Sequence, residues 1–449
     1  MTCCGRVIEV SCELRIRSVA PAAAGRGAQL VWSLLLAVAA VAWLPLPARA
    51  QAAAPVHLKA YVGGQQRPDI MRELFAQYSA AHPGIKVSLE VGGASSDLHQ
   101  KYLNMVLSAR DTTLDVFFID IIRPAQFAAA GWAEPLDGYL GNEREAVLSA
   151  YLPAYREANT VNGKTIALPG LADSLFLYYR KDLLAKYREA PPETWPELAR
   201  VARKIQQGEG DPNLQGLSFQ GKAVEGAVCT FLLPYWSLGG EIIRDGKISF
   251  ERAKAEAGLN MWRKMVSDGV SKANSSEVAT DDTRKEFQAG RVIFGVAWGY
   301  AWNHFQSGAD TRVKDKVGVV KLPAMPGGKP VSCMGGWNWA VSAYSKHKAE
   351  SVALIRWMSS PEVSKQLALK GSFHPVFPSV YRDPEVLAAV PWFADALPVV
   401  ETARPRPVTP VYRAISDALR INTNTVMAGI KSPQQALDEI EQRVARALR

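Results

Sequence analysis

Tryptophans beside glycines are the pattern in this sequence that points most directly to chemistry. The segments 298–302 (WGYAW) and 335–339 (GGWNW) carry four of the 12 tryptophans of the chain. An indole face packs on the apolar C–H face of a sugar ring, while nearby Asp, Asn or Arg groups pair with its hydroxyls. Glycine lets backbone and ligand approach closely. The two segments therefore predict a carbohydrate site, and the alternative is that each indole is an ordinary core residue.

Motifs of common catalytic sites are missing. The sequence contains no G-x-S-x-G, H-E-x-x-H, Walker loop or G-x-G-x-x-G, and no two of its six histidines are spaced i, i+4. A secreted glycan hydrolase stays an alternative, because the separation of two carboxylates cannot be measured from sequence. We expect binding without catalysis, no cofactor and no metal.

The first 50 residues have the pattern of a secretory signal peptide. Arg15, Arg17 and Arg26 precede the apolar stretch 30–46, and an Ala-x-Ala site follows at 48–50. The apolar stretch is slightly shorter than the ~20 residues that span a bilayer, which disfavours a membrane anchor. We expect cleavage after Ala50 and a periplasmic protein.

The net charge of +9 is spread over the chain, and basic residues are interleaved with acidic ones. No Lys/Arg block marks a nucleic-acid or lipid surface. A nucleic-acid partner is therefore not expected.

Short apolar strands alternate with amphipathic helices, which predicts an α/β fold with a mainly parallel sheet flanked by helices. Expected strands cover 56–62, 85–91, 114–119, 165–168, 291–296, 317–322 and 337–342. Expected helices begin near 68 and 194, cover 350–358 and 361–369, and close the chain after Ser432. Ligands of such sheets lie beyond the carboxyl ends of the strands, which makes Asp120 a candidate ligand residue.

Eight segments in order carry a family resemblance: AAHPGIKV (80–87), DVFFID (115–120), GWAEPL (131–136), LYYRKDLL (177–184), PPETW (191–195), FQGK (219–222) with Glu225-Gly226, GGW (335–337) and PRP (405–407). With them the chain resembles the extracellular solute-binding proteins of ATP-binding-cassette sugar importers, the maltose-binding-protein class, and most of all the trehalose/maltose-binding receptors. The resemblance implies a non-enzymatic monomer of two α/β lobes that captures a sugar and delivers it to permease subunits.

The resemblance also implies a set of ligand-binding residues. Carboxylates accept from sugar hydroxyls, an arginine donates to them, indoles stack on the rings and glycine backbone adds contacts. The residues in these roles are Asp120, Asp173, Arg406, Trp298, Trp337 and Gly336, together with Gly64 and Arg67 after the first strand.

Two positions depart from the trehalose-type receptors. Gln66-Arg67 stands where those receptors carry an acidic sugar ligand, and an arginine ligand of the next helix is replaced near His99. A disaccharide, oligosaccharide, glycoside or acidic sugar stays open as ligand. A binding protein of the same fold that serves signalling, with a sugar or another solute, is the further alternative.

The predicted lobes comprise residues 55–170 plus 331–371 and residues 171–330 plus 372–449, and they close by hinge motion. In this map Cys229 and Cys333 fall in different lobes. A disulfide between them would oppose opening, so we expect two free thiols.

Overall fold

The computed structural model describes residues 54–449 except 94 and 246. Residues Pro55–Arg449 form one compact unit. The signal peptide predicted over 1–50 lies outside the described residues. No helix in the described part of the chain combines the length and the apolar character needed to cross a bilayer.

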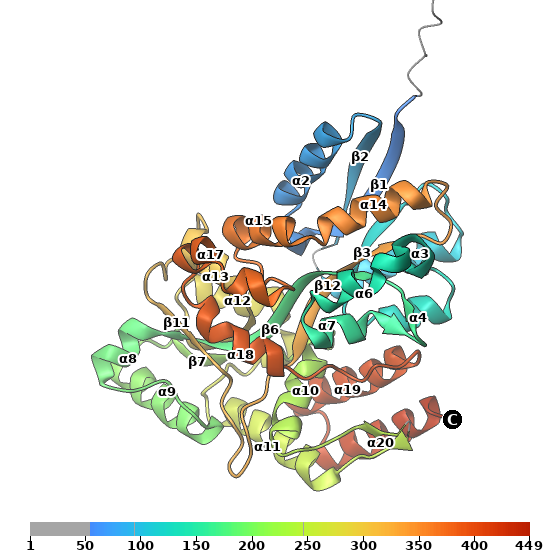
Figure 1. Ribbon diagram of the computed structural model, residues 1–449. Coiled ribbons are helices and arrows are strands. Elements are labelled where there is room, and N and C mark those ends of the chain that lie inside the picture. Colours follow the sequence, from blue (N-terminus) through green and yellow to red (C-terminus); the bar gives the residue numbers. More distant parts are fainter. Residues whose placement is uncertain (1–53, 94, 246) are drawn as a thin grey trace, which may run out of the picture. The chain divides into compact units, whose positions relative to one another are not determined.

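An eight-stranded sheet with the order β2-β1-β3-β12-β6-β10-β7, and β11 paired to β6, runs through this unit (Figure 1). Its strands are β1 Val56–Gly63, β2 Ile85–Gly92, β3 Val116–Asp120, β6 Leu168–Arg180, β7 Gln215–Ser218, β10 Val292–Trp298, β11 Val317–Val320 and β12 Met334–Val341. Two small hairpins stand apart, formed by β4 Thr160–Val161 with β5 Lys164–Thr165 and by β8 Ile243–Arg244 with β9 Lys247–Ile248.

The strand pairing is mixed. β1 is parallel to β2 and β3, and β10 is parallel to β7. β12 runs antiparallel to β3 and β6, and β6 runs antiparallel to β10 and β11. The sheet thus differs from the mainly parallel one expected, because β6 and β12 link the two ends of the sheet and do not belong to β-α-β units.

Helices cover the sheet (Figure 1). They are α2 Pro68–Ala81, α3 Ser96–Ser108, α4 Pro124–Ala129, α5 Asp137–Leu140, α6 Arg144–Ser149, α7 Pro153–Ala158, α8 Lys181–Tyr187, α9 Trp195–Glu209, α10 Gly226–Ser237, α11 Arg252–Ser267, α12 Thr280–Gln288, α13 Ala301–Ser307, α14 Lys348–Met358, α15 Pro361–Gly371, α16 Pro378–Tyr381, α17 Pro384–Ala389, α18 Phe393–Thr402, α19 Tyr412–Met427 and α20 Pro433–Ala447.

Local sequence signals explain several of these boundaries. Thr194 Oγ1 accepts from the Glu197 N–H at 3.4 Å where α9 begins, and Ser432 forms a reciprocal capping box with Gln435 at the start of α20. Both predicted helix starts are confirmed. The strand predicted over 165–168 differs, because β5 ends at Thr165 and the chain then continues in the 13-residue strand β6.

Two large hydrophobic clusters hold the unit together. One includes Leu58, Phe118 and Trp339 with residues of α2, α14 and α15. The other includes Trp195 and Trp262 with residues of α10, α19 and α20. Both clusters include residues of β6 and β10, so each packs against these two strands.

Cys229 in α10 and Cys333, which directly precedes β12, are joined by a disulfide with a Cα–Cα distance of 6.0 Å. The expectation of two free thiols was therefore wrong. Both cysteines are fully buried in the same hydrophobic cluster, so the bond does not join opposite sides of the molecule as the sequence-based lobe map assumed.

Candidate functional site

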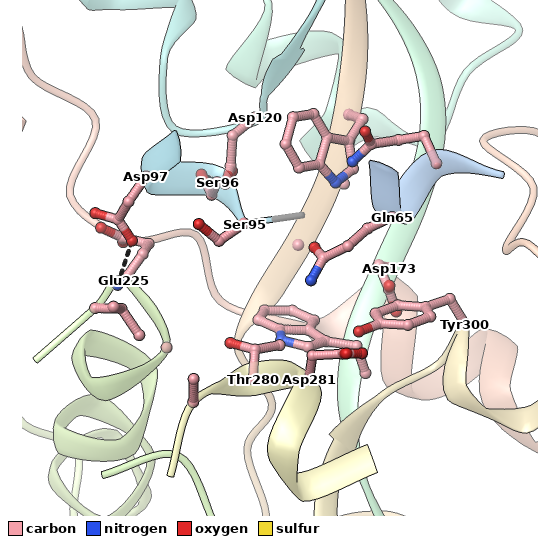
Figure 2. Close-up of a pocket in the computed structure, with 18 of the residues that line it drawn as sticks. Gln65, Ser95, Ser96, Asp97, Asp120, Asp173, Glu225, Thr280, Asp281 and Tyr300 are labelled. Atoms are coloured by element: carbon pink, nitrogen blue, oxygen red, sulfur yellow. Dashed lines mark hydrogen bonds between the residues drawn. The ribbon is translucent and has the colours of Figure 1, made fainter. Parts of the chain in front are cut away.

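A cavity of about 390 Å³ opens at the ends of several strands. Its lining comes from the turn after β1, the ends of β3 and β10, the middle of β6, the start of β12, and the first turns of α3, α10 and α12. The volume is within the range typical of small-molecule sites. Figure 2 shows its polar side chains, with Ser95, Ser96 and Asp97 on one side and Asp173 and Tyr300 on the other.

The structure brings six of the eight predicted site residues into the lining of this cavity: Asp120, Asp173, Trp298, Gly336, Trp337 and Arg406. Gly64 and Arg67 are not part of it. Contact of the six with a ligand stays a prediction.

Both lining indoles are half-buried. Trp337 lies opposite Asp120 in the β12–β3 register and packs edge-on against His99, with ring centroids 5.1 Å apart. Trp298 lies over Gly335, where a Cβ atom would come within 2.3 Å of the indole ring. Gly336 has φ of +139° and lies against the Leu171 carbonyl. The glycine pair is therefore needed for close packing beneath the two indoles.

Asp173 is held rigidly inside β6. Its Oδ1 accepts from the N–H groups of Ser174 and Gly299, both at 2.7 Å. Burial raises the pKa of Asp173 to about 7, so this carboxyl is partly protonated at neutral pH. It can thus both accept and donate a hydrogen bond.

Arg406 is the centre of a buried ionic network. The segment before it pairs with the start of β12 and the residues that precede it: the Met334 N–H donates to the Arg404 carbonyl, and the Arg404 N–H donates to the Ser332 carbonyl, both at 2.9 Å. Arg406 Nη1 donates to Glu225 Oε1 at 2.9 Å, and Nη2 lies 3.4 Å from Asp120 Oδ1. Only its Nε lacks an acceptor in the described part of the chain.

The carboxylates of Glu225 and Asp120 also accept hydrogen bonds from other side chains. Ser416 Oγ donates to Glu225 Oε2 at 2.7 Å, and Tyr412 donates to Oε1. Ser96 Oγ donates to Asp120 Oδ2 at 2.6 Å. Arg406 therefore neutralises two carboxylates at the wall of the cavity, and most of its donors are used within the protein.

The remaining polar lining was not assigned from sequence: Gln65, Gln66, Ser95, Ser96, Asp97, Lys101, Lys222, Glu225, Thr280, Asp281 and Tyr300. Two signals could have pointed to part of this set. Ser95-Ser96-Asp97 is a helix-start pattern directly after a strand, and Lys222 and Glu225 lie in a segment that carried the family resemblance.

Two contacts join segments on opposite sides of the cavity mouth. Asp97 Oδ2 accepts from the Glu225 N–H at 3.2 Å, the dashed contact in Figure 2. Arg67 Nη1 donates to Asn303 Oδ1 at 3.1 Å, while the same guanidinium pairs with Asp69. Arg67, predicted as a ligand residue, thus contacts the protein itself.

Comparison with known proteins agrees with this arrangement. Residues 64–365 match the family described as bacterial extracellular solute-binding protein. A relative from Deinococcus radiodurans, named "Probable ABC transporter-binding protein", is 35% identical over 375 residues, which are 82% of this chain and 88% of that protein. A "Mannitol-binding protein" of Pseudomonas aeruginosa is 24% identical over 405 residues, 84% of this chain and 90% of the relative. The maltose-bound structure of T. maritima MalE3 has a TM-score of 0.81 at 30% identity and covers 86% of this chain and 98% of its own.

The fold and the cavity define a two-lobed periplasmic binding protein, as predicted. The chain belongs to the bacterial extracellular solute-binding protein family. That family consists of binding proteins and not of enzymes.

Proposed function

We propose that this protein captures a sugar in the cavity and delivers it to the permease of an ATP-binding-cassette importer. The observation that carries the proposal is that Trp298 and Trp337 line one cavity together with Asp120, Asp173 and Arg406. Indole faces take up the apolar faces of sugar rings, and the polar groups pair with the hydroxyls around the rim.

The relatives support a sugar as the ligand. The T. maritima structure, at 30% identity, contains maltose. The P. aeruginosa relative is named for mannitol, which is a linear polyol. Two indoles in the lining favour a ring sugar for this chain, because a linear polyol has no extended face on which to stack.

Ligand contacts drawn from both lobes favour the closed state, since a ligand shifts an equilibrium by its differential affinity for the two states. The proposed lobes comprise 55–170 plus 331–371 and 171–330 plus 372–449, with the crossing after residue 330 moved to the C-terminal side of Cys333, because Cys333 is buried with Cys229. A few hydrogen bonds and two stacked rings, less the entropy of closure, give a binding free energy of about −8 kcal/mol, which is micromolar affinity. The protein acts as a periplasmic monomer.

Isothermal titration of the purified protein with mono- and disaccharides tests the proposal. At least one ring sugar should bind with a micromolar Kd, and Trp337→Ala should weaken it more than tenfold. Trp357→Ala is the matched control, because Trp357 is also half-buried but lies in α14 outside the cavity. Equal affinities of the two variants, or no binding of any sugar, would contradict the proposal.

A further inference from the structure

The carboxylates that line the cavity are already supplied with donors by the protein. Each of the five accepts hydrogen bonds or ion pairs from neighbouring groups: Asp97 from the Glu225 N–H, Asp120 from Ser96 and Arg406, Asp173 from two backbone N–H groups, Glu225 from Arg406, Tyr412 and Ser416, and Asp281 from Arg284 and Lys285. Asp120, Glu225 and Asp281 are thus paired with cations, whereas Asp97 accepts only a backbone N–H and has no cationic partner in the described part of the chain.

Two lysines in the lining are in the opposite situation. Lys101 in α3 and Lys222 in the loop before α10 both line the cavity and are exposed. Within the described residues, neither ammonium group lies within 4.0 Å of a carboxylate. These two cations are available to a ligand.

Both lysines belong to the same end of the cavity. Lys101 lies one helical turn after Asp97, and Lys222 lies three residues before Glu225. The 3.2 Å contact between Asp97 and the Glu225 N–H brings these two segments together across the mouth. Lys101 and Lys222 therefore belong to the two segments that meet at this contact.

The backbone adds positive potential at this end. The 12-residue helix α10 begins at Gly226, and this first residue lines the cavity. No side chain caps this N-terminus, because Glu225 turns its carboxylate to Arg406. The positive end of the helix dipole adds to the two ammonium groups, and the Asp97 carboxylate on the Glu225 N–H offsets part of this potential. An anion offers both ammonium groups an acceptor, whereas a neutral ligand does not pair with their charge.

We propose that the ligand is an anionic saccharide, whose ring lies against Trp298 and Trp337 and whose carboxylate or phosphate lies between Lys101 and Lys222. This inference rests on the proposed sugar-binding function and names its substrate class. The acid group would enter at the end where α3 meets α10, and the uncharged part of the sugar would extend toward Tyr300.

Calorimetric titration with matched pairs of ligands tests the inference. The pairs are galactobiose with digalacturonate, and trehalose and maltose each with its 6-uronate and its 6-phosphate. In at least one pair the anionic member should bind at least tenfold more tightly than the neutral one at 20 mM salt, and the preference should shrink at 500 mM salt. Comparison of the uronates with the phosphates shows which of the two anions the lysines bind.

The double variant Lys101→Gln/Lys222→Gln should bind the anionic and neutral members with equal affinity. Lys164→Gln is the control, because Lys164 is an exposed lysine of β5 outside the cavity, and it should keep the preference. Neutral sugars that bind as tightly as their anionic partners would overturn this inference and leave the sugar-binding function intact. A double variant that keeps the preference would also overturn it. Binding of no saccharide at all would overturn both proposals.

Discussion

Removal of the Cys229–Cys333 disulfide should lower the stability of the protein without changing how it binds its ligand. The two cysteines enclose a chain segment with a sequence separation of 104, and both are buried in the cluster around Trp195 and Trp262. Neither cysteine lines the cavity. The bond therefore restricts the unfolded chain and leaves the binding surface untouched.

The magnitude follows from the length of the closed loop. Loop-closure entropy for about 104 residues amounts to about 4.7 kcal/mol at 25 °C, and native disulfides commonly contribute about 2–4 kcal/mol. With about 2.1 cal/mol/K of unfolding entropy per residue, a unit of about 395 residues has about 0.8 kcal/mol/K. The variant Cys229→Ala/Cys333→Ala should therefore melt about 2–6 °C below the wild type.

Scanning calorimetry and ligand titration of the double variant provide the measurement. Wild-type protein unfolded and refolded in reducing agent is the control, and it should melt within about 2 °C of the double variant. An unchanged melting temperature would refute the loop-entropy argument. A change in ligand affinity beyond threefold, with the fold intact, would show that the bond also restrains the movement of the lobes.

Three further results are expected. Trp298→Ala should weaken binding of a ring sugar at least tenfold in calorimetric titration, while Trp298→Phe should keep part of the affinity because a phenyl ring still offers a face. Burial raises the pKa of Asp173 to about 7, whereas an unfolded Asp ionises near 3.9, so the folded state holds an extra proton between these values. The free energy of unfolding in urea should therefore fall as the pH rises from about 4 to 7, and Asp173→Asn should flatten that slope. Arg67 and Asn303 lie in different proposed lobes, so their contact favours the closed state. Arg67→Ala removes this contact and should lower the affinity for every ligand by a similar factor of about 2–10, while Asn303→Asp should raise the affinity.

Much of the fold could be predicted from sequence, because local signals and burial act on the same segments. The continuous apolar run that ends at Asp120 became the fully buried strand β3, and the cap residues Thr194 and Ser432 start helices as expected. The direction of strands could not be predicted in this way. Apolar runs in β6 and β12 look alike whether their neighbours are parallel or antiparallel, and only the chain path between them decides the pairing.

The lining of the cavity could be predicted from sequence where a residue type has one typical role in a binding site. Asp120 was predicted from its place at a strand end, and Trp298 and Trp337 from their neighbouring glycines; all three line the cavity. Arg67 as a ligand residue stays a prediction, because an arginine after the first strand can serve a ligand or the protein equally well. Its contact with Asn303 spans 236 residues of sequence, a distance over which no local pattern gives information.

Charge counting alone would have given the opposite ligand class. The cavity lining contains five carboxylates and three cations, which taken as a sum favour a positively charged or neutral ligand. The sum misleads because burial makes each carboxylate depend on its partners, and those partners come from distant segments: Asp97 and its donor Glu225 are 128 residues apart, and Asp120 and Arg406 are 286 apart. Asp120, Glu225 and Asp281 have cationic partners, whereas Asp97 accepts only a backbone N–H, so the two ammonium groups of Lys101 and Lys222 exceed the one carboxylate without a cationic partner at their end of the cavity. The sign of the charge that a binding site presents to its ligand is therefore set by which charged groups the fold leaves without a partner. Those groups can be identified from the structure but not from the sequence.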